Sequence, residues 1–308
     1  MTSALRCAAC SLAFGEDPSG TASNVRAFLL LEHGGPWPVA VRTASLPEGV
    51  APLLAACDAF AVRPLLVRRH GSRPGMPAHP WLALAVCHQD GGRGTARVLD
   101  ARELGRVPLA DLLACLRAGE TADGWEDMEE VFLTCTHGRH DACCAERGRP
   151  VAAALEAAAG AAAWEVSHVG GDRFAGNVLM LPDGLYYGRV TAERARELVA
   201  AHTRGRCVLD LLRGRCALPY AGQYAEIALR SRLAVTDVGA VRLVSLTRAG
   251  LRTSTTWTVD GRGTWRVSVD TTRPGPPRPL TCSTPATAPP VHRVVELTEL
   301  PAALAPPT

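Results

Sequence analysis

The stretch EVFLTCTHGRHDACCAERGRPVAAAL, residues 130–155, begins with a short apolar run and continues into a segment rich in strong helix formers. The apolar run ends at Cys135 and predicts a strand over 130–135. The Ala-rich composition of 144–163 predicts a helix, because Ala, Leu and Glu have high helix propensity. WEVSH at 164–168 reads as a second strand. Strand, helix and strand in this order predict two parallel strands joined by a right-handed crossover.

The residues that follow extend this unit. NVLMLPDGLYYGRV, residues 177–190, contains two apolar runs around Pro-Asp-Gly, which predicts a β-hairpin. TAERARELVAAH, residues 191–202, begins with Thr191 as a good N-cap and predicts an amphipathic helix. The full order is that of a thioredoxin-like βαβ-ββα domain, which we assign to residues 123–215.

Residues 25–119 show the same order more loosely. Runs at 25–32 and 62–69 predict strands, the segment between them a helix, and 81–100 a hairpin, with GGRG near its turn. LADLLACLRAG at 109–119 predicts a helix that ends at its glycine. We therefore expect an α/β (α+β) chain in which a second thioredoxin-like unit, within an N-terminal domain of residues 1–122, precedes the first.

The C-terminal third, residues 216–308, has a different pattern of predicted elements. AGQYAEIALRSRL at 221–233 predicts a helix, and four runs rich in Val, Thr and Trp predict an antiparallel sheet. TTRPGPPRPLTCSTPATAPP at 271–290 is a Pro-rich loop, and PAALAPPT at 301–308 is a tail. We expect a small helix-plus-sheet module here.

Composition limits the function classes. The net charge is only +3, all 33 basic residues are Arg, and the charges are mixed along the chain, so we expect no nucleic-acid partner. Coding bias is the simplest explanation of the missing Lys. No apolar stretch approaches eighteen residues or resembles a signal peptide, so we expect a cytoplasmic protein without a membrane partner. Eleven cysteines in such a chain favour free thiols or metal ligation over disulfides.

Four residues form the strongest candidate site. Cys135 closes one predicted strand and Cys144 opens the helix after it, while His168 and Asp172 follow the next parallel strand. The carboxyl ends of parallel strands meet at one edge of a sheet, so the two pairs of side chains should face each other. Side chains in such an arrangement can ligate a [2Fe–2S] cluster.

The same segments carry a family resemblance. TCTHGRHDACCAERGRPVAAAL (134–155), WEVSHVGGDRFAGNVLMLPDGLYYGRV (164–190) and CSLAFGEDPSGTA (10–22) resemble the sucrase/ferredoxin-like family, and the resemblance spans roughly residues 5–235. It implies a thioredoxin-like [2Fe–2S] protein that exchanges electrons with an unknown redox partner protein. It implies cluster ligation by Cys135, Cys144 and His168. Asp172 stands where the resembling members have His.

Several alternatives stay open. Asp172 is either a ligand or an ion-pair partner of Arg139 or Arg173. The histidines at 137 and 140 are expected to be exposed loop residues, with ligation as the minor alternative. Cys143 should pack away from the site, the pair Cys7 and Cys10 is weak evidence for zinc, and packing roles are expected for Cys57, Cys87, Cys115 and Cys282.

The resulting function hypotheses differ in class. The leading one is a non-enzymatic electron carrier with Cys135, Cys144, His168 and Asp172 as the cluster ligands, since the sequence shows no catalytic machinery. The others are a cluster-free thioredoxin-like binding scaffold and a mononuclear zinc site at the same four residues.

Overall fold

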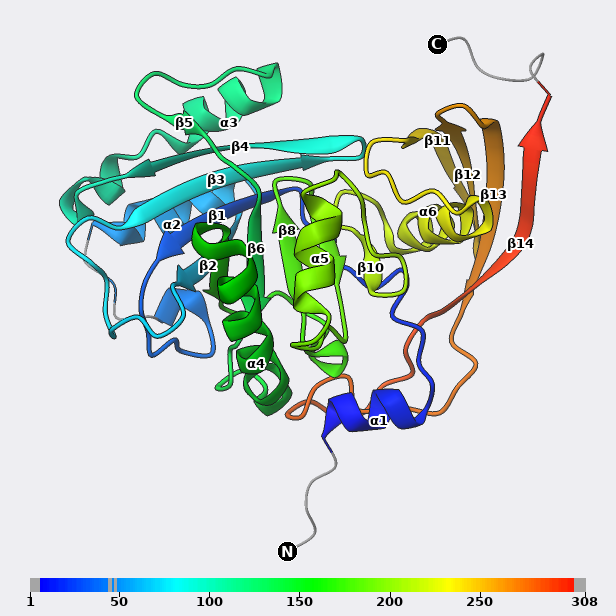
Figure 1. Cartoon of the computed structure of the whole chain (residues 1–308), viewed down its shortest axis with the longest axis horizontal. Coiled ribbons are helices and arrows are strands. Elements are labelled where there is room, and N and C mark those ends of the chain that lie inside the picture. The colour runs from blue at the N-terminus through cyan, green and yellow to red at the C-terminus, as the bar shows by residue number, and fades with distance from the viewer. Residues whose placement is uncertain (1–5, 44–45, 47–48, 302–308) are drawn as a thin grey trace, which may run out of the picture.

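The computed structural model describes residues 6–43, 46 and 49–301, which form two β-sheets with helices packed around them (Figure 1). The larger sheet has ten strands in the order β10-β9-β8-β6-β7-β2-β1-β3-β4-β5, and the smaller one has four. The predicted mixed α/β class is confirmed. The expected tail lies outside the described residues from position 302 onward.

The first half of the large sheet contains the elements predicted over 25–119. β1 pairs with β2 in parallel and with β3 antiparallel, and β3 and β4 form a hairpin. The predicted GGRG turn is wrong, because these residues begin strand β4 and the turn lies before them. The elements are α1 (Cys7–Ala13), β1 (Ala27–Glu32), α2 (Val50–Ala59), β2 (Arg63–Arg68), β3 (Trp81–His88), β4 (Gly91–Val98), α3 (Leu109–Ala118) and β5 (Glu126–Asp127).

The second half repeats this pattern of pairing. β6 pairs with β7 in parallel and with β8 antiparallel, and β8 continues into β9, as the sequence predicts. The local order β7-β6-β8-β9 therefore matches β2-β1-β3-β4. The elements are β6 (Val131–Cys135), α4 (Ala142–Ala159), β7 (Ala163–Val166), β8 (Val178–Leu181), β9 (Leu185–Tyr187), α5 (Ala195–His202) and β10 (Leu212–Arg215).

The two halves join where β2 pairs antiparallel with β7. This seam consists of two residue pairs, Val67 with Val166 and Arg68 with Glu165. The buried Glu165 carboxylate accepts hydrogen bonds from the Arg68 guanidinium at 2.6 and 2.8 Å and from the Thr136 hydroxyl at 2.8 Å. The ion pair therefore secures a short stretch of strand pairing.

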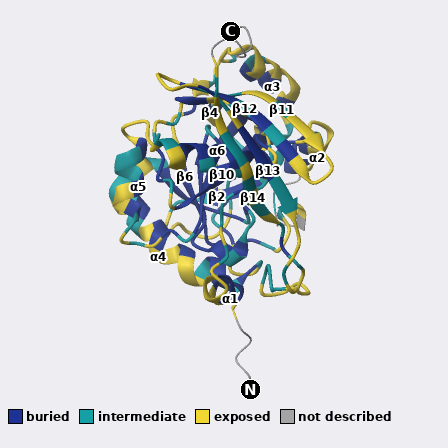
Figure 2. Ribbon diagram, turned by 90° about the vertical axis from the view of Figure 1, so that its right-hand side faces the viewer, coloured by how far each residue is buried: buried dark blue, intermediate teal, exposed yellow. Residues whose placement is uncertain are grey.

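Each face of the large sheet has its own hydrophobic core. Alternate residues of β1, β2, β6, β7 and β8 form one continuous core that spans both halves. On the other face, α2 and α3 cover the first half, and α4 and α5 cover the second. Val67 and Val166, which pair where the two halves meet, both belong to the continuous core. The helices α2 and α3 therefore cover the same face of the large sheet as α4 and α5. Figure 2 shows α4 and α5 exposed outward and buried toward the sheet.

The C-terminal third forms the predicted helix-plus-sheet module. α6 (Tyr220–Leu233) packs on an antiparallel sheet of β11 (Val241–Ala249), β12 (Arg252–Val259), β13 (Gly263–Thr272) and β14 (Val291–Leu300), in sequence order. Glu226 of α6 is buried and accepts a hydrogen bond from Arg230 at 2.9 Å. The Pro-rich loop between β13 and β14 returns to lie beside α1 (Figure 1).

Among the described residues, no helix combines the length and the apolar character needed to cross a membrane.

Candidate metal centre

The four residues predicted as a site lie together at one edge of the large sheet. Cys135 ends β6, Cys144 lies in the first turn of α4, and His168 and Asp172 lie in the loop after β7. The Cys144 thiol donates to Asp172 Oδ1 at 3.2 Å, and His168 Nδ1 lies 3.1 Å from the same oxygen. The Cys144 thiol also contacts the Cys135 sulfur. The parallel pairing of β6 and β7 brings both loops to this edge.

Two glycines permit this arrangement. A Cβ at Gly148 of α4 would lie 2.1 Å from the Cys135 carbonyl oxygen, so the helix can approach the end of β6 only with glycine there. Gly171 adopts φ +79°, and a Cβ there would lie 2.1 Å from the Arg213 guanidinium. Arg213 is buried beneath the loop and donates to the Gly170 carbonyl at 3.0 Å. The loop that carries the candidate ligands therefore rests on a buried cation.

The histidines of the first loop differ from the expectation. We expected them to be exposed, but His137 is buried and His140 is only partly exposed. The His140 ring stacks on His168 with 3.5 Å between ring centroids, and its Nε2 lies 3.6 Å from Asp172 Oδ2. No local sequence pattern predicts this contact, because it depends on how the first loop folds back across the second.

The arginine partners expected for Asp172 are absent from the described ion pairs. Arg173 instead pairs with Glu16 at 2.8 Å. Asp172 lies among histidines and a thiol, so its environment resembles a ligand shell more than a surface ion pair.

The electrostatics of the site lower the pKa of the Asp172 carboxyl and of one thiol. Burial alone would raise the pKa of Asp172, but its contacts with His168 and the Cys144 thiol outweigh burial and lower the pKa. The hydrogen bond from Cys144 lowers the pKa of Cys135 and raises that of Cys144. Burial lowers the pKa of His137 to about 4, so this ring is neutral at pH 7.

The donor set fits an iron–sulfur cluster chemically. Asp172 Oδ2 is buried and has no hydrogen-bond partner among the described residues, since His140 Nε2 is too distant. A buried anionic oxygen without a partner is costly unless a cation or proton satisfies it. Two thiols, an imidazole and this carboxylate offer the mixed sulfur, nitrogen and oxygen ligands that iron accepts.

A second group of potential ligands lies on the other side of the α4 N-terminus. Cys7, Asp141, Cys143 and Cys282 place one ligand atom each within 4.8 Å of one another. Cys143 packs away from Cys144, as the sequence predicts. Cys282 is exposed and contacts two other thiols, so the expectation that it is a packing residue is wrong. No sequence signal joins residues so far apart in the chain.

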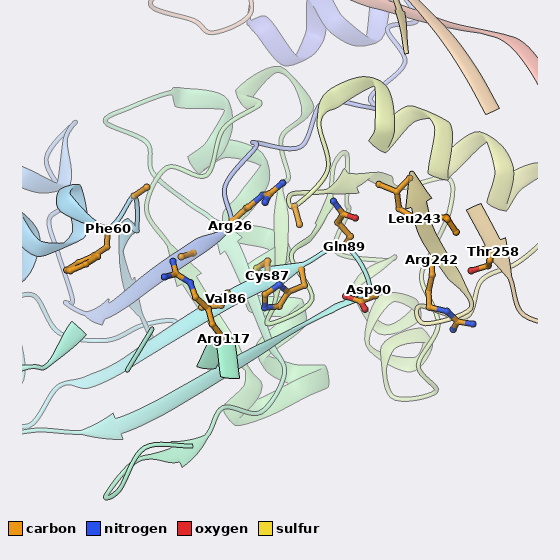
Figure 3. Close-up of a pocket in the computed structure, with 15 residues that line it drawn as sticks. Arg26, Phe60, Val86, Cys87, Gln89, Asp90, Arg117, Arg242, Leu243 and Thr258 are labelled. Carbon is orange, nitrogen blue, oxygen red and sulfur yellow. The ribbon is translucent and has the colours of Figure 1, made fainter. Parts of the chain in front are cut away.

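A large cavity lies elsewhere, between the β3–β4 hairpin and the small sheet (Figure 3). Its volume is about 740 Å³, and polar residues at its rim include Gln89 and Asp90 from the hairpin and Arg242 from β11. None of its lining residues belongs to either ligand group. The candidate chemistry therefore lies in the cysteine and histidine groups.

Comparison with known proteins identifies the family. Neither the curated proteins nor the solved structures contain a match to this chain. The model of the sucrase/ferredoxin-like family matches residues 18–214, which include the ten-stranded sheet except for the last residue of β10. The chain therefore belongs to the sucrase/ferredoxin-like family.

Proposed function

We propose that this protein transfers electrons with a [2Fe–2S] cluster held by Cys135, Cys144, His168 and Asp172. The observation that carries the proposal is that His168 and Cys144 both contact the buried Asp172 carboxylate, at 3.1 and 3.2 Å, while Cys135 lies buried in the same core as Cys144. A bound [2Fe–2S] cluster would accept and release single electrons.

The chain itself prepares these ligands. Cys144 lies in the first turn of α4, and its backbone amide donates to the Asp141 carbonyl at 3.1 Å, which fixes the start of the helix. Asp141 caps this helix by accepting a hydrogen bond from the Cys143 amide at 2.8 Å. Cys135 and Cys144 are fully buried, whereas the His168 side chain is 25% exposed. The cysteines would therefore form the inner side of the site and His168 its outer edge.

We also propose that both halves of the large sheet are thioredoxin-like. The shared strand orders β2-β1-β3-β4 and β7-β6-β8-β9 support this assignment. Domains at 1–122, 123–215 and 216–308 would then be two thioredoxin-like units followed by the helix-plus-sheet module. All eleven cysteines are free, which supports a reducing compartment such as the cytoplasm.

The outer edge suggests how an electron partner would dock. His168 and His137 line a surface hollow of about 240 Å³, together with Arg42 and Arg63. Cationic side chains around an electron-transfer site favour an acidic partner surface and speed its association. We expect the redox partner protein to present carboxylates here.

One observation favours a mononuclear zinc site as the second candidate. His140, His168 and Asp172 offer ligand atoms within 4.8 Å of one another, which is close enough for one ion. Zinc accepts histidine and carboxylate ligands in this way. A cluster-free scaffold is the third candidate, and it predicts that ligand substitutions leave stability unchanged.

The deciding experiment is spectroscopic. Anaerobically purified and reconstituted protein should be coloured, contain iron and acid-labile sulfide, and give a [2Fe–2S] signal in electron paramagnetic resonance after reduction with dithionite. Cys135→Ser and Cys144→Ser should each remove the cluster, while Cys143→Ser, at the adjacent position, should retain it. A colourless protein without iron after reconstitution contradicts the proposal, and zinc that disappears with His168→Ala supports the second candidate.

The fourth ligand is tested at Asp172. Asp172→His should retain the cluster and raise its reduction potential, because a neutral imidazole stabilises the reduced state better than an anionic carboxylate does. Asp172→Ala should shorten the lifetime of the cluster in air. If Asp172→Ala is unchanged and His140→Ala loses the cluster, His140 is the ligand and our assignment of Asp172 is wrong.

A further inference from the structure

Three thiols from distant parts of the chain meet beside the N-terminus of α4. Cys7 comes from α1, Cys143 from the first turn of α4, and Cys282 from the Pro-rich loop. Their sulfur–sulfur distances are 3.7 Å for Cys7–Cys143, 3.5 Å for Cys143–Cys282 and 3.5 Å for Cys282–Cys7. The three sulfurs thus form a nearly equilateral triangle.

Asp141 completes the group with a carboxylate. Its Oδ2 lies 3.6 Å and its Oδ1 3.8 Å from the Cys7 sulfur. Asp141, Cys7 and Cys143 are buried, and Cys282 closes the group from the surface side. We infer that Cys7, Asp141, Cys143 and Cys282 bind one structural zinc ion, separate from the proposed iron–sulfur site.

The spacing matches tetrahedral zinc. Zinc–sulfur bonds are about 2.3 Å long, so two sulfurs on one tetrahedral ion lie roughly 3.8 Å apart. A sulfur and a carboxylate oxygen on the same ion lie roughly 3.5 Å apart, given zinc–oxygen bonds of about 2.0 Å. The observed sulfur–sulfur separations are within about 0.3 Å of the first value, and the 3.6 Å contact agrees with the second.

Chemistry also favours zinc over the alternatives. Three thiols with one carboxylate form the soft, anionic donor set that selects zinc over magnesium or calcium. All four ligand atoms lie within 4.8 Å of one another, which suits one ion rather than a cluster of several. A disulfide would join only two of the sulfurs, at about 2.0 Å, and would leave the third thiol and the carboxylate without a role.

Backbone amides already support the anionic ligands. The Cys7 amide donates to the Cys282 sulfur at 3.4 Å, and the Cys282 amide donates to Asp141 Oδ2 at 2.6 Å. The Cys143 amide donates to Asp141 Oδ1. Each carboxylate oxygen retains a further lone pair for an ion. Hydrogen bonds of this kind orient metal ligands and hold them in place.

The role is structural because four protein ligands leave no open coordination position. The ion would fasten α1 and the Pro-rich loop to the N-terminal turn of α4. Cys143 and Cys144 are adjacent, so this turn presents one thiol to each site. The zinc ion would thereby hold the helix end that carries a proposed cluster ligand, but its binding does not require the cluster.

The test is metal analysis of the full-length protein. Wild-type protein should contain about one zinc per chain, and Cys7→Ser and Cys282→Ser should reduce this to less than about a tenth. Cys10→Ser is the matched control, because Cys10 is a buried thiol of the same helix α1 and lies outside the group. Cobalt substitution should give a thiolate-to-cobalt charge-transfer band that Cys282→Ser removes. Cys282 is exposed, so its substitution should leave the fold intact.

The zinc site and the proposed iron–sulfur site can be disrupted independently. Cys135→Ser should remove iron and keep zinc, whereas Cys282→Ser should remove zinc and keep iron. Zinc content that is unchanged in Cys282→Ser, or wild-type protein that binds neither zinc nor cobalt through thiolates, overturns the inference. A colourless wild-type protein whose zinc is lost with Cys282→Ser supports the inference while refuting the iron–sulfur proposal.

Discussion

Arg213 should be among the most destabilising positions to change, because its charge is buried beneath the loop of His168 and Asp172. Its side chain is 1% exposed and forms no ion pair within the described part of the chain. The guanidinium donates to the Thr21 carbonyl at 2.6 Å and to the Asn177 side chain at 2.8 Å, in addition to Gly170. Burial lowers its pKa to about 10, so it remains charged at pH 7.

Arg213→Met would leave the buried Asn177 side-chain oxygen and the two partly buried carbonyls without this donor. An unsatisfied buried acceptor costs about 1–3 kcal/mol. Removal of the buried charge returns part of this cost, because the charge itself is expensive to desolvate. We therefore expect a net loss of about 3–5 kcal/mol, a large share of the roughly 5–15 kcal/mol that stabilises a typical protein.

Urea unfolding measures this change through the transition midpoint at constant slope. Arg248→Met, at an exposed position of β11, is the matched control and should change stability by less than about 0.5 kcal/mol. Arg213→Lys should recover only part of the loss, because an ammonium cannot reproduce the forked donor geometry. If Arg213→Met unfolds at the wild-type midpoint, the guanidinium does not support the loop and our account of the site is wrong.

Three further changes test the packing around the site and the C-terminal module. The pKa of Glu165 is lowered in the folded protein, where hydrogen bonds outweigh burial, so its contribution to stability should be present above pH 4.5 and disappear as the pH falls through the folded pKa. Glu165→Gln should cost about 1–3 kcal/mol at pH 7 and flatten the acid side of the stability curve measured by urea unfolding; an unchanged curve would argue against this role. Gly171→Ala should destabilise the protein by at least about 1–2 kcal/mol, because alanine is strained at φ +79° and its Cβ would clash with the Arg213 guanidinium. Iron retention and the midpoint of urea unfolding should both fall. Wild-type values for both would show that the loop can relax. Glu226→Gln removes the carboxylate that lies 2.9 Å from the buried Arg230, and should lower stability by about 3–5 kcal/mol. Thermal unfolding measures this loss, and an unchanged transition temperature would contradict it.

Local patterns were sufficient to predict most elements. The run that ends at Cys135 and the Ala-rich segment after Cys144 became β6 and α4, and the Pro-Asp-Gly turn became the β8–β9 hairpin. Hydrophobic periodicity and turn residues are properties of neighbouring positions, so they can be read without tertiary information. The closeness of Cys144, His168 and Asp172 followed from parallel pairing, which the strand–helix–strand order implies.

Long-range pairing could not be predicted in this way. The β2–β7 seam depends on which edges of two sheets meet, and no local pattern specifies an edge partner. The burial of His137 depends on the packing of Trp37 against its ring, with 5.9 Å between centroids. The group of Cys7, Cys143 and Cys282 requires the last loop to return to the first helix. These features arise from tertiary contacts alone.

The seam also bears on how the chain avoids aggregation during synthesis. Three of the six residues of β2 are buried, and β1 occupies one of its edges. Its other edge meets β7, which is made almost a hundred residues later. Until then, a hydrophobic strand in the first half presents unpaired backbone groups that could recruit another chain. A fragment that ends before β6 should therefore self-associate, and addition of the segment through β7 should restore a monomer by covering that edge.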